Sequence, residues 1–181
     1  MSTRMSEHGS GPVISCKFGT LEDINERFDH MTDASDRKET WRVWKERAIR
    51  YFLEGKRRQY ILQADGRNIG EAFAALTPDA CSNSDRLVGP HTAYLFAFRV
   101  DEGLREHGYF TRLFEFMLDD LRGLGITRVT VGVEPRELRN KQIYRHYGFT
   151  QFVKTSFEED PPNEPGEMPY RYLVEYYAKD L

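Results

Sequence analysis

A bend in the middle of the chain brings together residue types that bind anions. The segment LREHGYFTRLF, residues 104–114, contains Arg105 and, where a helical pattern begins, Gly108. The first N–H groups of a helix have no partner inside the helix, and the helix dipole adds partial positive charge there. A phosphate group would fit such a bend, particularly where a glycine lets the backbone come close. On composition alone, an ordinary turn is the stronger interpretation.

The bend does not match the common nucleotide-binding motifs. A Walker loop needs G-x-x-x-x-G-K-[ST] and a dinucleotide fingerprint needs G-x-G-x-x-G, and neither pattern occurs here. The bend also has no Lys, and no carboxylate is placed to hold Mg²⁺. An enzyme acting on nucleotide phosphates is therefore a weak hypothesis.

The elements before the bend predict a strand, two helices and a hairpin. Thr20 and Asp23 have capping-box spacing and begin the first helix. Asp65-Gly66 readily adopts positive φ and predicts a tight turn between two apolar runs. Trp41 and Trp44 lie on the apolar stripe of the second helix, where we expect them to pack in the core. The expected elements are a strand over 13–19, helices over 20–31 and 37–53, and a hairpin over 58–76.

The elements from the bend onward alternate between strands and helices. The run TAYLFAFRV predicts a buried strand before the bend, and apolar residues from Phe110 keep helical spacing until Gly123 and Gly125. Pro135 is expected at the start of a short helix, with Gly148 as its left-handed C-terminal residue. The expected elements are a strand over 92–100, a helix over 110–123, a strand over 126–134, a helix over 135–147, and strands over 149–157 and 170–178.

This order predicts an α+β fold. The long helix between the strands at 92–100 and 126–134 implies a parallel pair with a right-handed crossover. Hairpins elsewhere imply antiparallel pairing. We therefore expect a mixed, mostly antiparallel seven-stranded sheet with helices on both faces. Residues 13–181 would form one domain, preceded by a disordered tail over residues 1–12.

Composition excludes several classes of protein. Lys plus Arg number 26 against 29 Asp plus Glu, giving a net charge of −3, so no nucleic-acid partner is expected. Cys16 and Cys81 are far apart and fit neither a disulfide framework nor a metal site, so no metal is expected. No apolar run reaches about 18 residues, and the polar N-terminus lacks a signal-peptide core. A cytoplasmic location without membrane attachment is the expectation.

Two motifs in register resemble the GNAT superfamily of N-acetyltransferases. Arg105-Glu106-His107-Gly108-Tyr109-Phe110 is similar to the family's Q/R-x-x-G-x-G/A signature, and IYRHYGF, residues 143–149, is similar to its Y-x-x-x-G-F segment. The expected element order from residue 13 to the C-terminus also matches. The run VTVGVEPRELRNKQIYRHYGFT is similar to a bacterial subgroup with little functional description. The chain is therefore identified as a member of this superfamily, which implies the acyl-CoA N-acyltransferase fold.

Two positions depart from the family pattern. Phe110 occupies the usual Gly or Ala position, and its side chain is expected to point into the core instead of toward a ligand. Glu137 stands where the family often has Asn, seven residues before Tyr144. Asn140, one helical turn before Tyr144, would supply a similar polar contact to the cofactor.

The resemblance implies a binding site for acetyl-CoA. The two parallel strands would splay apart to admit the pantetheine arm, and the bend would bind the pyrophosphate through its backbone N–H groups. The expected pantetheine-binding residues are Phe98, Arg99 and Val100, and the expected pyrophosphate-binding residues are Arg105, Glu106, His107, Gly108, Tyr109, Phe110 and Thr111.

The resemblance also implies the catalytic groups. Tyr144 matches the family's usual general acid, which protonates the CoA thiolate; packing of its ring under the helix is the alternative. Glu134 and, ranked second, Glu71 are candidates for the base, because desolvation in a cleft would raise the pKa of either carboxyl. Each is otherwise an ordinary hydrogen-bonded strand residue, and water chains often replace a single base in this family. His107 and His146 are expected to be solvated surface residues.

The implied activity is transfer of the acetyl group of acetyl-CoA to a primary amine by direct attack in a ternary complex. The alternative is a non-catalytic acyl-CoA-binding module on the same fold, since a fold does not determine a function. The acceptor pocket would be shaped by the first two helices, the loop over 77–91 and the segment 158–169, so its ligand stays open. The last two strands, taken as sheet edges, would pair two copies into a homodimer.

Overall fold

The computed structural model describes residues 11–181, so the tail expected over residues 1–12 falls almost wholly outside the described part. The elements in chain order are β1 (Ile14–Phe18), α1 (Leu21–Asp33), α2 (Lys38–Leu53), β2 (Arg57–Ala64), β3 (Arg67–Ala75), the 3₁₀ turn η1 (Pro78–Ala80), β4 (Thr92–Val100), the 3₁₀ turn η2 (Glu102–Leu104), α3 (Tyr109–Gly123), β5 (Arg128–Val133), α4 (Leu138–His146), β6 (Gln151–Asp160) and β7 (Tyr170–Asp180).

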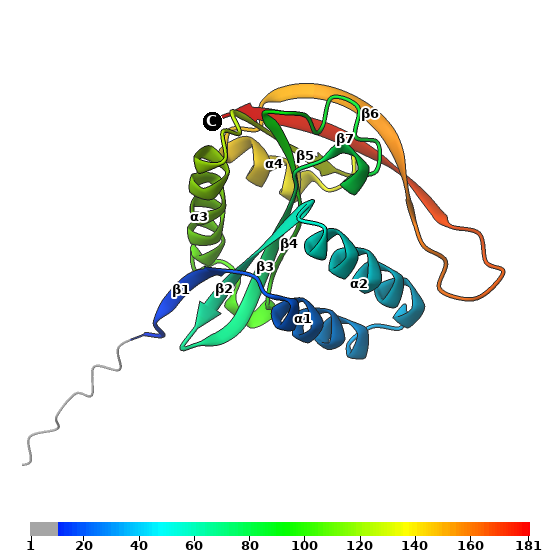
Figure 1. Cartoon of the computed structure of the whole chain (residues 1–181), viewed down its shortest axis with the longest axis horizontal. Helices are drawn as coiled ribbons and strands as arrows, with labels where there is room; N and C mark the ends of the chain where they lie inside the picture. The colour runs from blue at the N-terminus through cyan, green and yellow to red at the C-terminus, as the bar shows by residue number, and fades with distance from the viewer. Residues whose placement is uncertain (1–10) are drawn as a thin grey trace, which may run out of the picture.

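The strands form one mixed sheet of seven strands, as predicted. Their order is β1-β2-β3-β4-β5-β7-β6, and β4 and β5 are its parallel pair. Helices α3 and α4 cover one face, and α1 and α2 cover the other (Figure 1). The local signals also hold: Thr20 and Asp23 form the capping box of α1, and Asp65 and Gly66 turn the β2–β3 hairpin with φ of 50° and 78°.

The parallel ladder is short, and β4 and β5 separate beyond it. Residues 92–95 of β4 pair with 128–131 of β5, the last pair being Leu95 and Val131. Two residues later Ala97 takes φ of 55° in a β-bulge, where β4 has one residue more than β3 between the pairs Phe73–Phe96 and Glu71–Arg99. A bulge bends its strand and increases its twist. It therefore turns the end of β4 away from β5 and leaves a fork between them.

The same bulge reverses which way the side chains of β4 point. Phe96 packs with Phe73 and the tryptophans of α2, whereas Phe98 packs against Phe110 and Phe114 of α3. In a regular strand both would lie on one face, because successive side chains alternate. The bulge thus places Phe96 on the sheet face covered by α1 and α2, and Phe98 on the face covered by α3.

Three details of the sequence prediction are wrong. Pro135 is not in a helix: Glu134–Glu137 form a turn closed by the Glu137 N–H and the Glu134 carbonyl, with proline at its favoured second position, and α4 begins at Leu138. Strand β6 continues to Asp160, because residues 158–160 pair with β7. Strand β7 is not an edge, because it lies between β5 and β6.

Candidate active site

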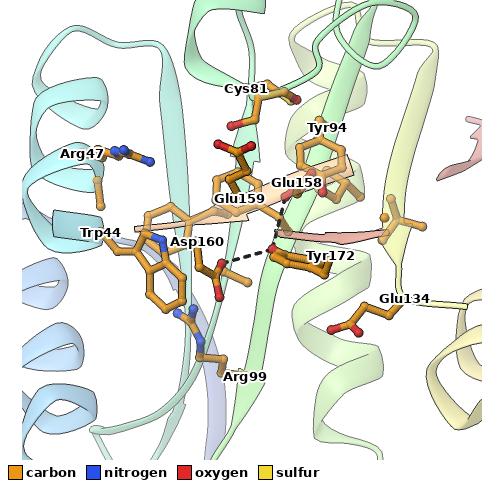
Figure 2. A pocket seen from close by; sticks show the side chains of 18 of the residues that line it. Trp44, Arg47, Cys81, Tyr94, Arg99, Glu134, Glu158, Glu159, Asp160 and Tyr172 are labelled. Carbon is orange, nitrogen blue, oxygen red and sulfur yellow. Dashed lines mark hydrogen bonds between the residues drawn. The ribbon is translucent and has the colours of Figure 1, made fainter. Parts of the chain in front are cut away.

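A cavity of about 580 Å³ opens beside the fork, on the sheet side that carries α1 and α2. Leu95, Val131 and Gly132 line it where the two strands separate. Its walls come from α2, the segment after η1, β6 and β7, and so include parts of both segments expected around the acceptor. Figure 2 labels Trp44, Arg47, Cys81, Tyr94, Arg99, Glu134, Glu158, Glu159, Asp160 and Tyr172 among the lining side chains.

Tyr144 lines this cavity from α4. Its ring packs against Phe98 and Phe149, with centroids 6.1 and 6.0 Å away. Burial raises the pKa of the Tyr144 phenol to about 12. The hydroxyl therefore stays protonated at neutral pH and can donate a proton. Tyr144 thus packs its ring against neighbouring aromatic side chains and also lines the cavity. The two interpretations from the sequence, a general acid and a packed ring, are therefore compatible.

The two carboxylates predicted from the sequence lie in different surroundings. Glu134 lines the cavity just after β5, with its side chain 26% exposed, and forms an ion pair with Arg136 at 2.9 Å. Glu71 does not line the cavity. Its carboxylate is 1% exposed and accepts hydrogen bonds from Arg99 and Gln59, both at 2.8 Å. Both oxygens of Glu71 are therefore occupied by neighbouring side chains.

Glu158 is a carboxylate of the cavity that the sequence did not point to. It accepts a hydrogen bond from the hydroxyl of Tyr176. The Tyr172 hydroxyl lies 3.5 Å from Glu158 and 3.2 Å from Asp160, as Figure 2 shows, and can donate its single proton to either carboxylate. Burial raises the pKa of the Glu158 carboxyl, and the nearby Asp160 raises it further. A raised pKa makes the ionised carboxylate a stronger base than an ordinary glutamate. The sequence does contain a signal for this position. The pair Pro161-Pro162 follows β6, which ends at Asp160, three residues later than the sequence prediction of 157.

A hydroxyl also lies directly at the fork. A Cβ on Gly132 would stand 2.9 Å from the hydroxyl of Tyr94, so only glycine leaves room for that phenol. Burial raises the pKa of Tyr94 well above its ordinary value, and the charge of Glu158 is the next largest cause. Tyr94 is therefore a neutral donor between the fork and Glu158.

The bend before α3 has the features needed to receive an anion. Gly108 caps the helix with φ of 74°, and no atom lies within 4 Å of where its Cβ would be. The N–H groups of Tyr109 and Phe110 have no carbonyl one turn earlier, as in any helix, whereas the Thr111 N–H donates to the Gly108 carbonyl at 3.1 Å. Arg105, Glu106 and His107 are exposed beside it. The bend lies at the end of β4, where the Arg105 Nε donates to the Val100 carbonyl at 3.0 Å.

The two departures from the family pattern have defined contacts. Phe110 packs against Phe98, Phe114 and Tyr147, and so joins the core on the α3 side as expected. Asn140 donates to the Glu137 carboxylate at 3.0 Å, and neither residue lines the cavity. His107 and His146 are exposed. Thr111, one turn into α3, is hydrogen-bonded to the Tyr147 hydroxyl.

Within residues 11–181, no three His, Cys, Asp or Glu side chains are grouped to hold a metal ion. The helices of this same part are all too short or too polar to cross a membrane.

Solved structures of acetyltransferases share this fold. The IAA acetyltransferase from Bacillus cereus ATCC 14579 is 18% identical with a TM-score of 0.62, covering 93% of this chain and 100% of its own. A Bacillus subtilis acetyltransferase in complex with CoA is 16% identical with a TM-score of 0.62, and the match covers 93% of this chain and 99% of that one. The ribosomal-protein-S18-alanine N-acetyltransferase from Escherichia coli is 14% identical with a TM-score of 0.59, covering 93% and 94%. At these identities the likeness establishes the fold.

The family is established by sequence. No functionally curated protein matches the chain significantly. The family model described as "Acetyltransferase (GNAT) family" matches residues 21–149, which is more than half of the chain and includes both the bend before α3 and Tyr144. The chain therefore belongs to the GNAT acetyltransferase family.

Proposed function

We propose that this protein transfers the acetyl group of acetyl-CoA to a primary amine by direct attack in a ternary complex. The observation that carries the proposal is the fork between β4 and β5, which opens onto a cavity containing Tyr144 and Glu158. One continuous space beside the fork would let the amine and the thioester meet without a covalent enzyme intermediate.

The chain offers matching groups for acetyl-CoA. The cap at Gly108 and the first N–H groups of α3 would bind the pyrophosphate, with Arg105 adjacent. The backbone of Phe98, Arg99 and Val100, on the part of β4 that has left β5, would bind the pantetheine amides. A backbone N–H directed at the thioester oxygen lowers the barrier by about 3 kcal/mol in comparable acyl transfers.

Two side chains would move the protons. The amine attacks the thioester carbon in its neutral form, and Glu158 accepts the proton that nitrogen loses as the C–N bond forms. The C–S bond breaks, and Tyr144 gives its phenolic proton to the sulfur, so that the products are the acetylated amine and CoA with a free thiol. Proton exchange with solvent then restores both side chains.

The remaining carboxylates support this arrangement. Glu134, at the cavity wall, would attract a cationic amine, although Arg136 offsets part of its charge. Glu71 would hold Arg99 in place, because both of its oxygens are used in the sheet. Glu158 is preferred as the base because burial raises its pKa and no described cation forms an ion pair with it.

One observation favours a second function, a non-catalytic acyl-CoA-binding module. Phe110 fills the position where the family has Gly or Ala, and its ring occupies space beside Phe98. Such a module would bind the thioester without turning it over.

Release of free CoA thiol over a panel of amines, together with calorimetric binding of acetyl-CoA, tests the proposal. We expect amine-dependent thiol release, and loss of about 100-fold or more in kcat for Tyr144→Phe with the KM for acetyl-CoA unchanged. Tyr147→Phe is the matched control, because Tyr147 directly follows the same helix but bonds Thr111 and does not line the cavity.

Other outcomes discriminate between the hypotheses. Binding of acetyl-CoA without turnover on any acceptor would support the module. Thermal stabilisation by ATP but not by acetyl-CoA would contradict both. Full turnover by Tyr144→Phe would remove this side chain from the mechanism.

A further inference from the structure

Arg57 places a cation in the cavity without an opposite charge. Its Nε and Nη2 both donate to the Ala80 carbonyl, at 2.9 and 2.6 Å, and its guanidinium lies over the rings of Tyr51 and Phe96. No carboxylate within residues 11–181 forms a salt bridge with it. Burial lowers the pKa of Arg57 to about 10, and repulsion from Arg47 and Arg50 adds to this. The carbonyl and the rings fix the guanidinium, but nothing in the described chain neutralises it.

Glu158 is its counterpart of opposite sign. Its hydrogen-bond partners are the phenols of Tyr172 and Tyr176, and no cation of the described chain forms an ion pair with it. The charge that acts on its pKa is that of another carboxylate, Asp160. Buried charges in proteins are normally paired, because an unpaired one loses hydration without compensation.

The other charged side chains of the cavity are already paired or lie at its mouth. Three ion pairs account for most of them: Arg37 with Asp160 at 3.1 Å, Arg99 with Glu71 at 2.8 Å and Arg136 with Glu134 at 2.9 Å. Arg47 and Glu159 are exposed. Arg57 and Glu158 therefore remain as two half-buried charges of opposite sign without an ion-pair partner.

A row of aromatic side chains in mutual contact runs from Arg57 to Glu158. The Arg57 guanidinium is 4.8 Å from the centroid of Phe96, and Phe96 stacks on Tyr94 with centroids 5.6 Å apart. Tyr94 in turn lies 6.1 Å from Tyr176, whose hydroxyl bonds Glu158. Burial raises the pKa of the Cys81 thiol to about 12; among the smaller effects on this pKa, Glu158 raises it and Arg57 lowers it, so both charges act on the same group. The two charges therefore line the same cavity, and no ion pair joins them.

We infer that the acetyl acceptor is amphoteric, with its amine at Glu158 and a carboxylate at Arg57. This inference rests on the proposed function and names the substrate class of the same site. The planar guanidinium fork matches a carboxylate, and its orientation is preset by the Ala80 carbonyl. The amine end would lie by Tyr94 and Gly132, at the fork where the thioester is expected.

This arrangement makes both ends of the acceptor necessary. An amine without an acid group leaves Arg57 uncompensated, and an acid without an amine leaves Glu158 without a partner. A site with buried polar groups rejects a ligand that fails to satisfy them more strongly than it rejects a small difference in size.

Matched sets of ligands test the inference: the proteinogenic and ω-amino acids, the amines left by removing the carboxylate, and the acids left by removing the amine. Binding is measured by calorimetry in the presence of CoA, and turnover by thiol release with acetyl-CoA. We expect at least one amino acid to bind ten or more times tighter than both of its matched compounds. Arg57→Gln should abolish that preference with acetyl-CoA affinity unchanged, and Arg57→Lys should restore part of it.

Arg58→Gln is the control, because Arg58 is the next residue of β2 but pairs with Asp120 on the opposite face of the sheet. It should keep the preference. The inference is overturned if simple amines bind as tightly as amino acids, if no amino acid in the panel binds, or if Arg57→Gln keeps the preference. A different outcome would contradict the proposed function: ligands that bind in the presence of CoA while no acceptor is acetylated.

Discussion

The role in proton transfer proposed for Glu158 would come with a cost in stability. Burial raises the pKa of its carboxyl above the ordinary value of 4.5. The folded state therefore binds this proton more tightly than the unfolded state, and stability is lost as the pH rises through the folded pKa. Enzymes commonly lose some folding stability at the residues that make the active site reactive.

Glu158→Gln separates the two effects. Because glutamine does not ionise, we expect the melting temperature of the variant to exceed that of the wild type increasingly as the pH rises from 4.5. Activity should fall, and the acidic limb of the wild-type pH profile, with an apparent pKa above 4.5, should disappear. Glu159→Gln removes the same charge at an exposed neighbour and should change neither. A loss of stability in Glu158→Gln across the whole pH range would contradict this assignment.

Residues of the site differ in how far the sequence revealed them. Tyr144 and the bend at Gly108 could be found because each belongs to a short local motif. Arg57 and Glu158 could not, because they are about a hundred residues apart and become neighbours of one cavity only through the sheet order. Neither has a local pattern that distinguishes it from an ordinary charged strand residue.

Two glycines mark the ends of α3 and provide a test of the anion site. Gly108 begins the helix with φ of 74° and Gly125 follows its end with φ of 80°, and no atom lies near the Cβ position of either. Replacement by alanine should destabilise the fold equally at both positions, by about 1 to 2 kcal/mol, because both backbones are left-handed.

Only the first of these glycines is at the proposed phosphate site. Gly108→Ala should therefore weaken acetyl-CoA binding about tenfold, which corresponds to about 1.4 kcal/mol, whereas Gly125→Ala should leave it unchanged. Calorimetry gives the affinity and denaturant unfolding gives the stability. Equal affinity in both variants would exclude Gly108 from the phosphate site.

The β-bulge at Ala97 was not predictable from sequence. Alanine at φ of 55° is uncommon, and TAYLFAFRV gives no glycine or proline that would indicate an interruption. Pairing with β3 imposes the extra residue on β4. The bulge nevertheless decides which side chains face the cavity, and so determines the site more than any local motif.

At the scale of the whole molecule, the open edge at β6 bears on assembly. The sheet ends with β6, and Phe152 and Phe157 on it are 60% and 50% exposed. A long edge strand with apolar side chains presents free N–H and C=O groups to another copy. We therefore expect a homodimer formed by pairing at β6 instead of β7, which is internal.

Light scattering checks this expectation. The wild type should scatter as a dimer and Phe157→Lys as a monomer, because an edge lysine opposes strand pairing, while acetyl-CoA affinity stays the same. Leu53→Lys changes an equally apolar, exposed residue at the end of α2 and should remain dimeric. A monomeric wild type would contradict the expectation.

The sequence by itself determined most of the elements, the parallel β4–β5 pair, the family and the glycine-capped bend before α3, because caps, turns, hydrophobic periodicity and short motifs act over a few residues. The tertiary structure alone decided the insertion of β7 between β5 and β6, the bulge that opens the fork, and the meeting of Arg57 with Glu158 in one cavity. These depend on pairings between distant strands, whose energies come from burial and from the hydrogen-bond ladder of the whole sheet. The charge pattern that would select the acceptor belongs to this second group.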